Sequence, residues 1–143
     1  MKYYFDASAL VKRFKPERGQ ATVRDILHHA LLGDHEIHSI DWARAEFYVA
    51  MRRSNVPQKL AAKNLKTLAE VVEFDPLTRD TMDNALGLIY EFHLHAADAM
   101  HLSACTELSC DAMLTDDEHL VSKEVMEHLE KQAVKLVNLE ENP

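Results

Sequence analysis

Glycine, cysteine and long apolar runs are all scarce in this sequence. Three glycines, Gly19, Gly33 and Gly87, are spread along the chain, whereas a glycine-rich phosphate loop needs several close together. This disfavours a P-loop or Rossmann nucleotide-binding domain. The two cysteines, Cys105 and Cys110, match neither a zinc knuckle nor a CxxC redox motif. We therefore expect two reduced thiols.

The chain also lacks a candidate membrane span or signal peptide. No apolar run approaches the roughly 20 residues that a transmembrane helix needs. Asp6 interrupts the start of the chain, where a signal peptide continues its apolar region. We therefore expect a cytoplasmic protein with no membrane contact. What is present, 143 residues of which 47% are hydrophobic and 28% charged, is typical of one globular domain covering residues 1–143.

The net charge of −8 argues against nucleic-acid binding, which usually comes with a basic surface. Basic residues are nevertheless grouped in three places: Lys12, Arg13, Lys15 and Arg18; Arg44, Arg52 and Arg53; and Lys59, Lys63 and Lys66. Solvated helix surface is the usual explanation of such groups. A protein that holds a metal ion with acidic residues also has a negative formal net charge, because the charge of the metal is not included in it.

Apolar periodicity and turn residues divide the chain into alternating strands and helices. The predicted strands cover residues 2–6, 36–40, 71–74, 112–115 and 134–139, and the predicted helices cover residues 8–14, 21–32, 41–53, 57–70, 76–92, 96–108 and 118–126. Strands joined through helices pair in parallel, with helices on both faces. We therefore predict an α/β fold with three layers, α/β/α, around a mainly parallel sheet. Ligands of such sheets bind beyond the carboxyl ends of the strands.

Acidic residues stand at the ends of two predicted strands. Asp6 ends the first strand, and Asp116 and Asp117 end the fourth. The strand-end rule places all three on the ligand-binding edge of the sheet. Adjacent residues at a strand end point to opposite sides, so we do not expect Asp116 and Asp117 to be equivalent.

Two further acids lie on predicted helices among small or apolar neighbours. Asp98 is in a first helical turn, and Glu46 borders an apolar stripe that includes Trp42, Ala45 and Val49. A carboxylate on an apolar face is unfavourable unless something pairs with it. For Asp98, stabilisation by the helix dipole is an equal alternative. For Glu46, exposure to solvent or an ion pair with a neighbouring arginine is the simpler interpretation.

Converging carboxylates repel one another unless a cation balances them. All-oxygen ligands favour a hard cation, Mg²⁺ or Mn²⁺, over zinc, and the nine histidines show no paired spacing such as HExxH. A carboxylate-held Mg²⁺ suits the hydrolysis of phosphodiester bonds, because the metal can activate water and orient a phosphate. The residues thus predict a metal-dependent nuclease, and no Ser-His-Asp or Cys-His arrangement stands out as a rival.

Four segments carry a resemblance to a known family. Residues 4–12 read YFDASALVK, residues 97–102 read ADAMHL and residues 114–117 read LTDD. The fourth segment, Ala45-Glu46, lies on the helix predicted at 41–53. These segments resemble, in order, the motifs of PIN domains of the VapC toxin type. The Ala45-Glu46 match is the least specific, and the similarity spans nearly the whole chain.

The resemblance implies a PIN-like fold and an endoribonuclease that depends on Mg²⁺, with Mn²⁺ as a substitute. It also implies a toxin neutralised by a cognate antitoxin protein, often as a homodimer. The positions that match the family's metal ligands are Asp6, Glu46, Asp98 and Asp117, and the positions that match its small hydroxyl residues are Ser8 and Thr115. Asp116 is an additional acid that could also approach the metal.

We further predict that Lys12, Arg13 and Lys15, which follow Asp6 closely in the sequence, hold the RNA backbone. Two alternatives stay open: a PIN nuclease of RNA processing without an antitoxin, and a PIN-like scaffold that binds RNA or protein without cleaving. The complete set of acids argues against the scaffold. A haloacid-dehalogenase-type phosphatase is a more distant alternative, because Ser8 stands where a second aspartate is needed.

Overall fold

The structure is a computed structural model, which describes residues 1–142. The expected domain, residues 1–143, therefore lies within the described residues except for its last position. None of the described helices is both long enough and apolar enough to cross a membrane.

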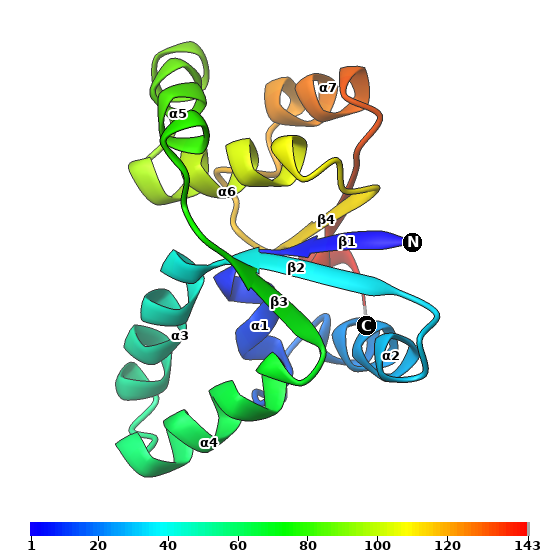
Figure 1. Ribbon diagram of the computed structural model, residues 1–143, viewed down its shortest axis with the longest axis vertical. Helices are drawn as coiled ribbons and strands as arrows, with labels where there is room; N and C mark the ends of the chain where they lie inside the picture. The colour runs from blue at the N-terminus through cyan, green and yellow to red at the C-terminus, as the bar shows by residue number, and fades with distance from the viewer. Residues whose placement is uncertain (143) are drawn as a thin grey trace.

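Five strands form one sheet in the middle of the molecule (Figure 1). They are β1 (Lys2–Phe5), β2 (Glu36–Ile40), β3 (Val72–Asp75), β4 (Ala112–Thr115) and β5 (Lys135–Asn138). The spatial order is β3-β2-β1-β4-β5, and every neighbouring pair is parallel. The prediction of a mainly parallel sheet is confirmed. β1 lies at the centre, with β2 on one side and β4 on the other, so the residues that follow β1 and β4 meet at one edge.

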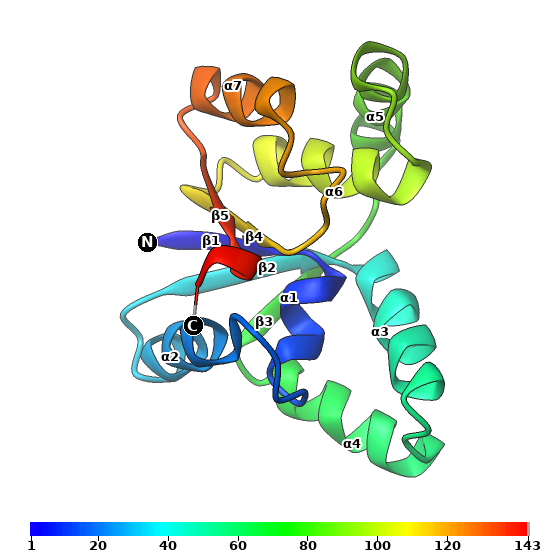
Figure 2. The same cartoon turned by 180° about the vertical axis from the view of Figure 1, so that it is seen from behind.

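Seven α-helices connect these strands within the described chain. They are α1 (Ala7–Lys12), α2 (Gln20–Leu31), α3 (Asp41–Arg53), α4 (Gln58–Ala69), α5 (Arg79–Phe92), α6 (Ala96–Glu107) and α7 (Lys123–Lys131), and a short 3-10 turn, η1 (Leu139–Glu141), follows β5. Helices α1 to α4 cover one face of the sheet, and α5 to α7 cover the other (Figures 1 and 2). The predicted α/β/α layering is confirmed.

The two faces of the sheet belong to two separate apolar cores. Phe5 packs with residues of α1, α2 and α3, whereas its neighbour Tyr4 packs with residues of α5, α6 and α7. Both side chains are fully buried. Successive side chains of a strand point to opposite faces, and a parallel sheet is covered on both, which is why β1 and β4 consist almost entirely of apolar residues.

Several predicted features differ from the structure. The helix predicted at 76–92 begins only at Arg79, where the Thr78 side chain accepts a hydrogen bond from the Thr81 amide. The predicted helix 118–126 is wrong, because α7 begins only at Lys123, where the Ser122 side chain accepts a hydrogen bond from the Val125 amide and caps the helix. On α3 the predicted apolar stripe is wrong as well. Trp42 and Val49 are 49% and 48% exposed, while Ala43, Phe47 and Met51 form the buried face.

Candidate active site

Asp6 directly follows β1 and caps the amino end of α1. Its Oδ1 atom accepts hydrogen bonds from the Ser8 hydroxyl (2.6 Å) and the Ala9 amide (3.0 Å), and its Oδ2 atom accepts one from the Thr115 hydroxyl. The side chain is only 4% exposed. Burial raises the pKa of Asp6, although the charge of His101 and these hydrogen bonds oppose that shift. The carboxylate is therefore held in one orientation.

Thr115 and Ser8 link the acids that follow the two central strands. The Thr115 hydroxyl, at the end of β4, also accepts a hydrogen bond from the Asp117 amide (3.0 Å). The Ser8 hydroxyl accepts one from the Asp116 amide (3.0 Å). These contacts exist because β1 and β4 are paired in the sheet. Both hydroxyls thus connect the backbone after β4 to the Asp6 carboxylate.

Asp98 lies in the first turn of α6, where its carboxyl group is within hydrogen-bonding reach of Asp117. Partial burial, the contact with Asp117 and the charges of Asp117 and Asp6 together raise the pKa of Asp98 to about 7. The Asp98 carboxyl group therefore lies among acids from separate elements, with more negative than positive charge around it. Oxygen donors with this surplus of negative charge fit a hard divalent cation.

Glu46, on α3, forms its closest contact with a histidine that the sequence analysis did not select. His101 Nε2 donates a hydrogen bond to Glu46 Oε1 (2.6 Å), and His101 Nδ1 is hydrogen-bonded to the Tyr4 hydroxyl (2.7 Å). His101 is 2% exposed. Burial alone lowers the pKa of His101, but the bond to Glu46 and the charge of Asp6 outweigh it and raise that pKa. His101 is part of the ADAMHL segment at residues 97–102, so its place in that motif could have identified it as a site residue.

A pocket of about 480 Å³ opens at this edge of the sheet. It is lined by all five predicted acids, Asp6, Glu46, Asp98, Asp116 and Asp117, together with His101, Ser8, Lys15, Glu17, Arg53 and four apolar residues. The structure therefore brings together acids that are up to 111 positions apart in the sequence, from Asp6 to Asp117. Arg53, at the end of α3, also lines the pocket, although its sequence position predicted only solvated helix surface or an ion pair with Glu46.

A sequence profile of the PIN domain family matches residues 3–125. The chain belongs to the PIN domain family. No curated protein matches by sequence. PIN domains are typically metal-dependent nucleases.

Solved structures share the fold at low sequence identity. VapBC2 from Rickettsia felis, bound to a promoter DNA fragment, superposes with a TM-score of 0.69 at 13% identity, covering 96% of this chain and 98% of the other. A toxin–antitoxin complex from Klebsiella pneumoniae gives 0.59 at 15% identity, covering 85% and 92%. A protein from Pyrobaculum aerophilum gives 0.57 at 22% identity, covering 93% and 98%. Each match supports the PIN-like fold.

The two adjacent acids after β4 of the PIN domain have different partners. Asp117 approaches Asp98, as described above, and its Oδ1 atom accepts a hydrogen bond from the His119 amide (2.9 Å). Asp116 instead forms an ion pair with Lys12, with 2.7 Å between Oδ2 and Nζ. The expected inequivalence of the two acids is therefore visible in their contacts.

The three cations predicted to hold RNA occupy three different environments. Lys12 is fully buried, so a direct contact with RNA does not fit its position, and this part of the prediction is corrected. Arg13 lies over the Phe14 ring, 5.2 Å from its centre, and lines a separate pocket between α2 and α4. Only Lys15 lines the acidic pocket. The sequence order of three successive basic positions could not reveal this division.

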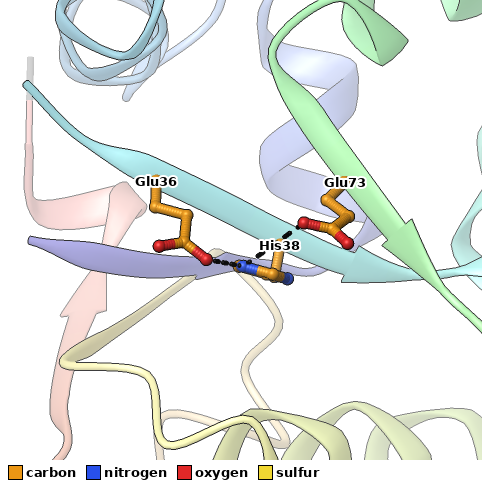
Figure 3. Close-up of side chains that lie close together, drawn as sticks. All are labelled: Glu36, His38 and Glu73. Carbon is orange, nitrogen blue, oxygen red and sulfur yellow. Dashed lines mark hydrogen bonds and ion pairs between the residues drawn. The ribbon is translucent and has the colours of Figure 1, made fainter. Parts of the chain in front are cut away.

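A second group of possible metal ligands lies on β2 and β3 (Figure 3). Ligand atoms of Glu36, His38 and Glu73 all lie within 4.8 Å of one another, and within residues 1–142 no other such group is this compact. The acids of the pocket are therefore more widely spaced. His38 is already engaged on both nitrogens, by Glu36 Oε1 (2.5 Å) and Asp75 Oδ2 (2.7 Å). The bond to Asp75 ties β2 to β3, whereas the bond to Glu36 lies within β2.

Proposed function

We propose that this PIN domain is a metal-dependent endoribonuclease that hydrolyses phosphodiester bonds of RNA, and that it is the toxin of a toxin–antitoxin pair. The observation that carries the proposal is the convergence of Asp6, Glu46, Asp98 and Asp117 on one pocket at the carboxyl edge of the sheet. The raised pKa of Asp98 supports the proposal, because it means that the surrounding residues leave the negative charge of this carboxylate uncompensated.

Asp6, Asp98 and Asp117 are the residues that would hold Mg²⁺, with Mn²⁺ as a substitute, since all three offer carboxylate oxygens. When bound, such a cation lowers the pKa of a water molecule and orients the scissile phosphate. The protein's own part is to hold the carboxylates: Ser8 and Thr115 fix Asp6. His101 holds Glu46 through its Oε1 atom, and the Oε2 atom takes no part in that hydrogen bond.

The RNA backbone is bound by Lys15 and Arg53, which line the pocket together with the acids. Cations placed beside a carboxylate site can neutralise the phosphates that flank the scissile one. Lys15 follows α1 and Arg53 ends α3, so they belong to different elements of the pocket wall. Of the predicted set, Lys15 is retained, Lys12 is too buried for this contact, and Arg13 lines a separate pocket.

Two of the structures that share this fold contain toxin–antitoxin assemblies, which supports the proposal of an antitoxin partner. We infer a cognate antitoxin protein as the inhibitor, a homodimer as the assembly and the cytoplasm as the location. A PIN nuclease of RNA processing, without an antitoxin, is the alternative. Co-expression with the product of a small adjacent reading frame separates the two, because only a toxin co-purifies with that product and is inhibited by it.

Cleavage of a labelled structured RNA by purified protein, with Mg²⁺ and with EDTA, tests the activity. We expect cleavage only with the metal, and its loss in Asp6→Asn and Asp98→Asn. The matched control is Asp83→Asn, which removes an exposed acid of α5 and should retain activity. Contaminating ribonuclease would cleave in all preparations alike. Cleavage that persists in EDTA or in both site variants refutes the proposal.

A further inference from the structure

Lys12, the last residue of α1, is a lysine whose side chain is only 1% exposed. Its ammonium group lies 2.7 Å from Asp116 Oδ2, 3.3 Å from Glu17 Oε1 and 3.9 Å from Glu140 Oε1. A buried ammonium is unfavourable unless opposite charges surround it. Of the three acids, Asp116 is both the closest and the most buried, with 23% of its side chain exposed against 42% and 58% for the others.

The stem of Lys12 is enclosed by two segments that are distant in sequence. Gly19, in the turn before α2, has φ of +89°, and a Cβ atom there would lie 3.1 Å from Lys12 Cδ and 2.9 Å from Leu139 Cβ. The turn before α2 and η1 thus meet over the lysine stem. Glycine permits both this backbone conformation and this close approach. Lys12 consequently points inward, toward the segment after β4.

Asp116 is the acid that this inward ammonium meets, although Asp116 also lines the pocket beside Asp117. Its amide is held separately, by the Ser8 hydroxyl. The ion pair with Lys12 therefore decides the direction of the Asp116 carboxylate. Without the Lys12 ammonium, the Asp116 carboxylate would be free to turn toward the pocket that it lines together with Asp98 and Asp117.

We propose that Lys12 is a positioning residue that holds the Asp116 carboxylate away from the metal-binding acids, so that Asp117 alone serves as the ligand after β4. The proposal rests on the proposed metal-dependent function. Lys12 neither touches the substrate nor binds the metal. It acts through Asp116, by keeping one additional carboxylate from altering the number of ligands around the cation.

Titration calorimetry with Mn²⁺ on the purified full chain tests this, alongside RNA turnover, in the wild type, Lys12→Met and Lys12→Met/Asp116→Asn. In Lys12→Met we expect Mn²⁺ to bind at least about threefold more tightly, because an extra carboxylate faces the cation. We expect kcat to fall about tenfold or more, since the ligands are misplaced. The double variant removes both charges and should return both values to within about threefold of wild type. Lys123→Met, which changes an 87% exposed lysine, is the control.

Each outcome decides the proposal. A folded Lys12→Met with wild-type Mn²⁺ affinity and turnover overturns it, and so does a double variant as impaired as Lys12→Met. If Lys12→Met does not fold, the neutral pair in the double variant decides by the same comparison with wild type. Wild-type protein that binds no Mn²⁺ overturns the proposed function and this proposal together. Wild-type protein that binds Mn²⁺ without cleaving RNA refutes only the proposed activity, because the affinities still test Lys12.

Discussion

Asp98→Asn should stabilise the metal-free protein at pH 8 while it abolishes cleavage. The pKa of Asp98 rises from 3.8 to about 7 in the folded protein, so its ionised form is disfavoured by folding. A raised carboxyl pKa gives stability that is complete below pH 3.8 and is lost as the pH rises to about 7. A shift of this size corresponds to about 4 kcal/mol. Because the group is partly exposed, solvent screening reduces this to about 1–2 kcal/mol.

Urea unfolding in EDTA at pH 8 and pH 5 measures this effect, since the midpoint and slope give the free energy of unfolding. The asparagine side chain carries no charge, so the variant should be more stable than wild type at pH 8, with less than half of that gain at pH 5. Adding Mn²⁺ should stabilise the wild type more than the variant. Asp83→Asn is the control for removing an acid. A variant that is no more stable than wild type at pH 8, or equally stabilised at both pH values, refutes the reasoning.

Three further predictions concern other parts of the chain. Thr115→Val removes the hydroxyl between Asp6 and the Asp117 amide; we expect unfolding to become easier by about 1–3 kcal/mol and Mn²⁺ affinity to fall, as measured by urea titration and calorimetry. Burial lowers the pKa of His38, but its hydrogen bonds to carboxylates outweigh burial and raise that pKa above 6.5. The protonated imidazole therefore stabilises the fold fully below pH 6.5, and this contribution is lost as the pH rises through the pKa of the folded state. We expect the difference in unfolding free energy between wild type and His38→Gln, measured by urea titration, to shrink between pH 6 and 9. Arg53→Ala should weaken RNA binding and reduce the salt slope by about 1; an unchanged slope would contradict a phosphate contact.

Much of the fold could be predicted because local signals agreed with one another. The alternation of strands and helices predicted parallel pairing, and the strand-end rule then placed Asp6 and Asp117 at one edge. This rule needs only strand direction and not side-chain packing. The helix faces were harder. Trp42 and Val49 are apolar but exposed, and residue type alone cannot tell which of two apolar faces packs on the sheet.

The missed parts of the site depend on contacts between distant segments. His101 reaches Glu46 only because α3 and α6 lie on opposite faces of the same sheet edge, and 55 residues separate the two in the chain. Lys12 is one of several basic residues near Asp6, and its burial depends on η1, at the other end of the chain. Periodicity within one segment contains no information about such partners, so the sequence could not distinguish the buried Lys12 from the half-buried Lys15.

The arrangement also explains why the net charge of −8 is a poor guide to what this protein binds. Three of the acids in the total, Asp6, Asp98 and Asp117, are those that a divalent cation would neutralise. Lys12 is counted as a cation but its charge is balanced inside the molecule by Asp116. Under the proposed function, a phosphate backbone at the pocket would meet Lys15, Arg53 and a divalent cation held by these acids. Local geometry, and not the total charge, decides whether an acidic protein of this kind can hold a polyanion.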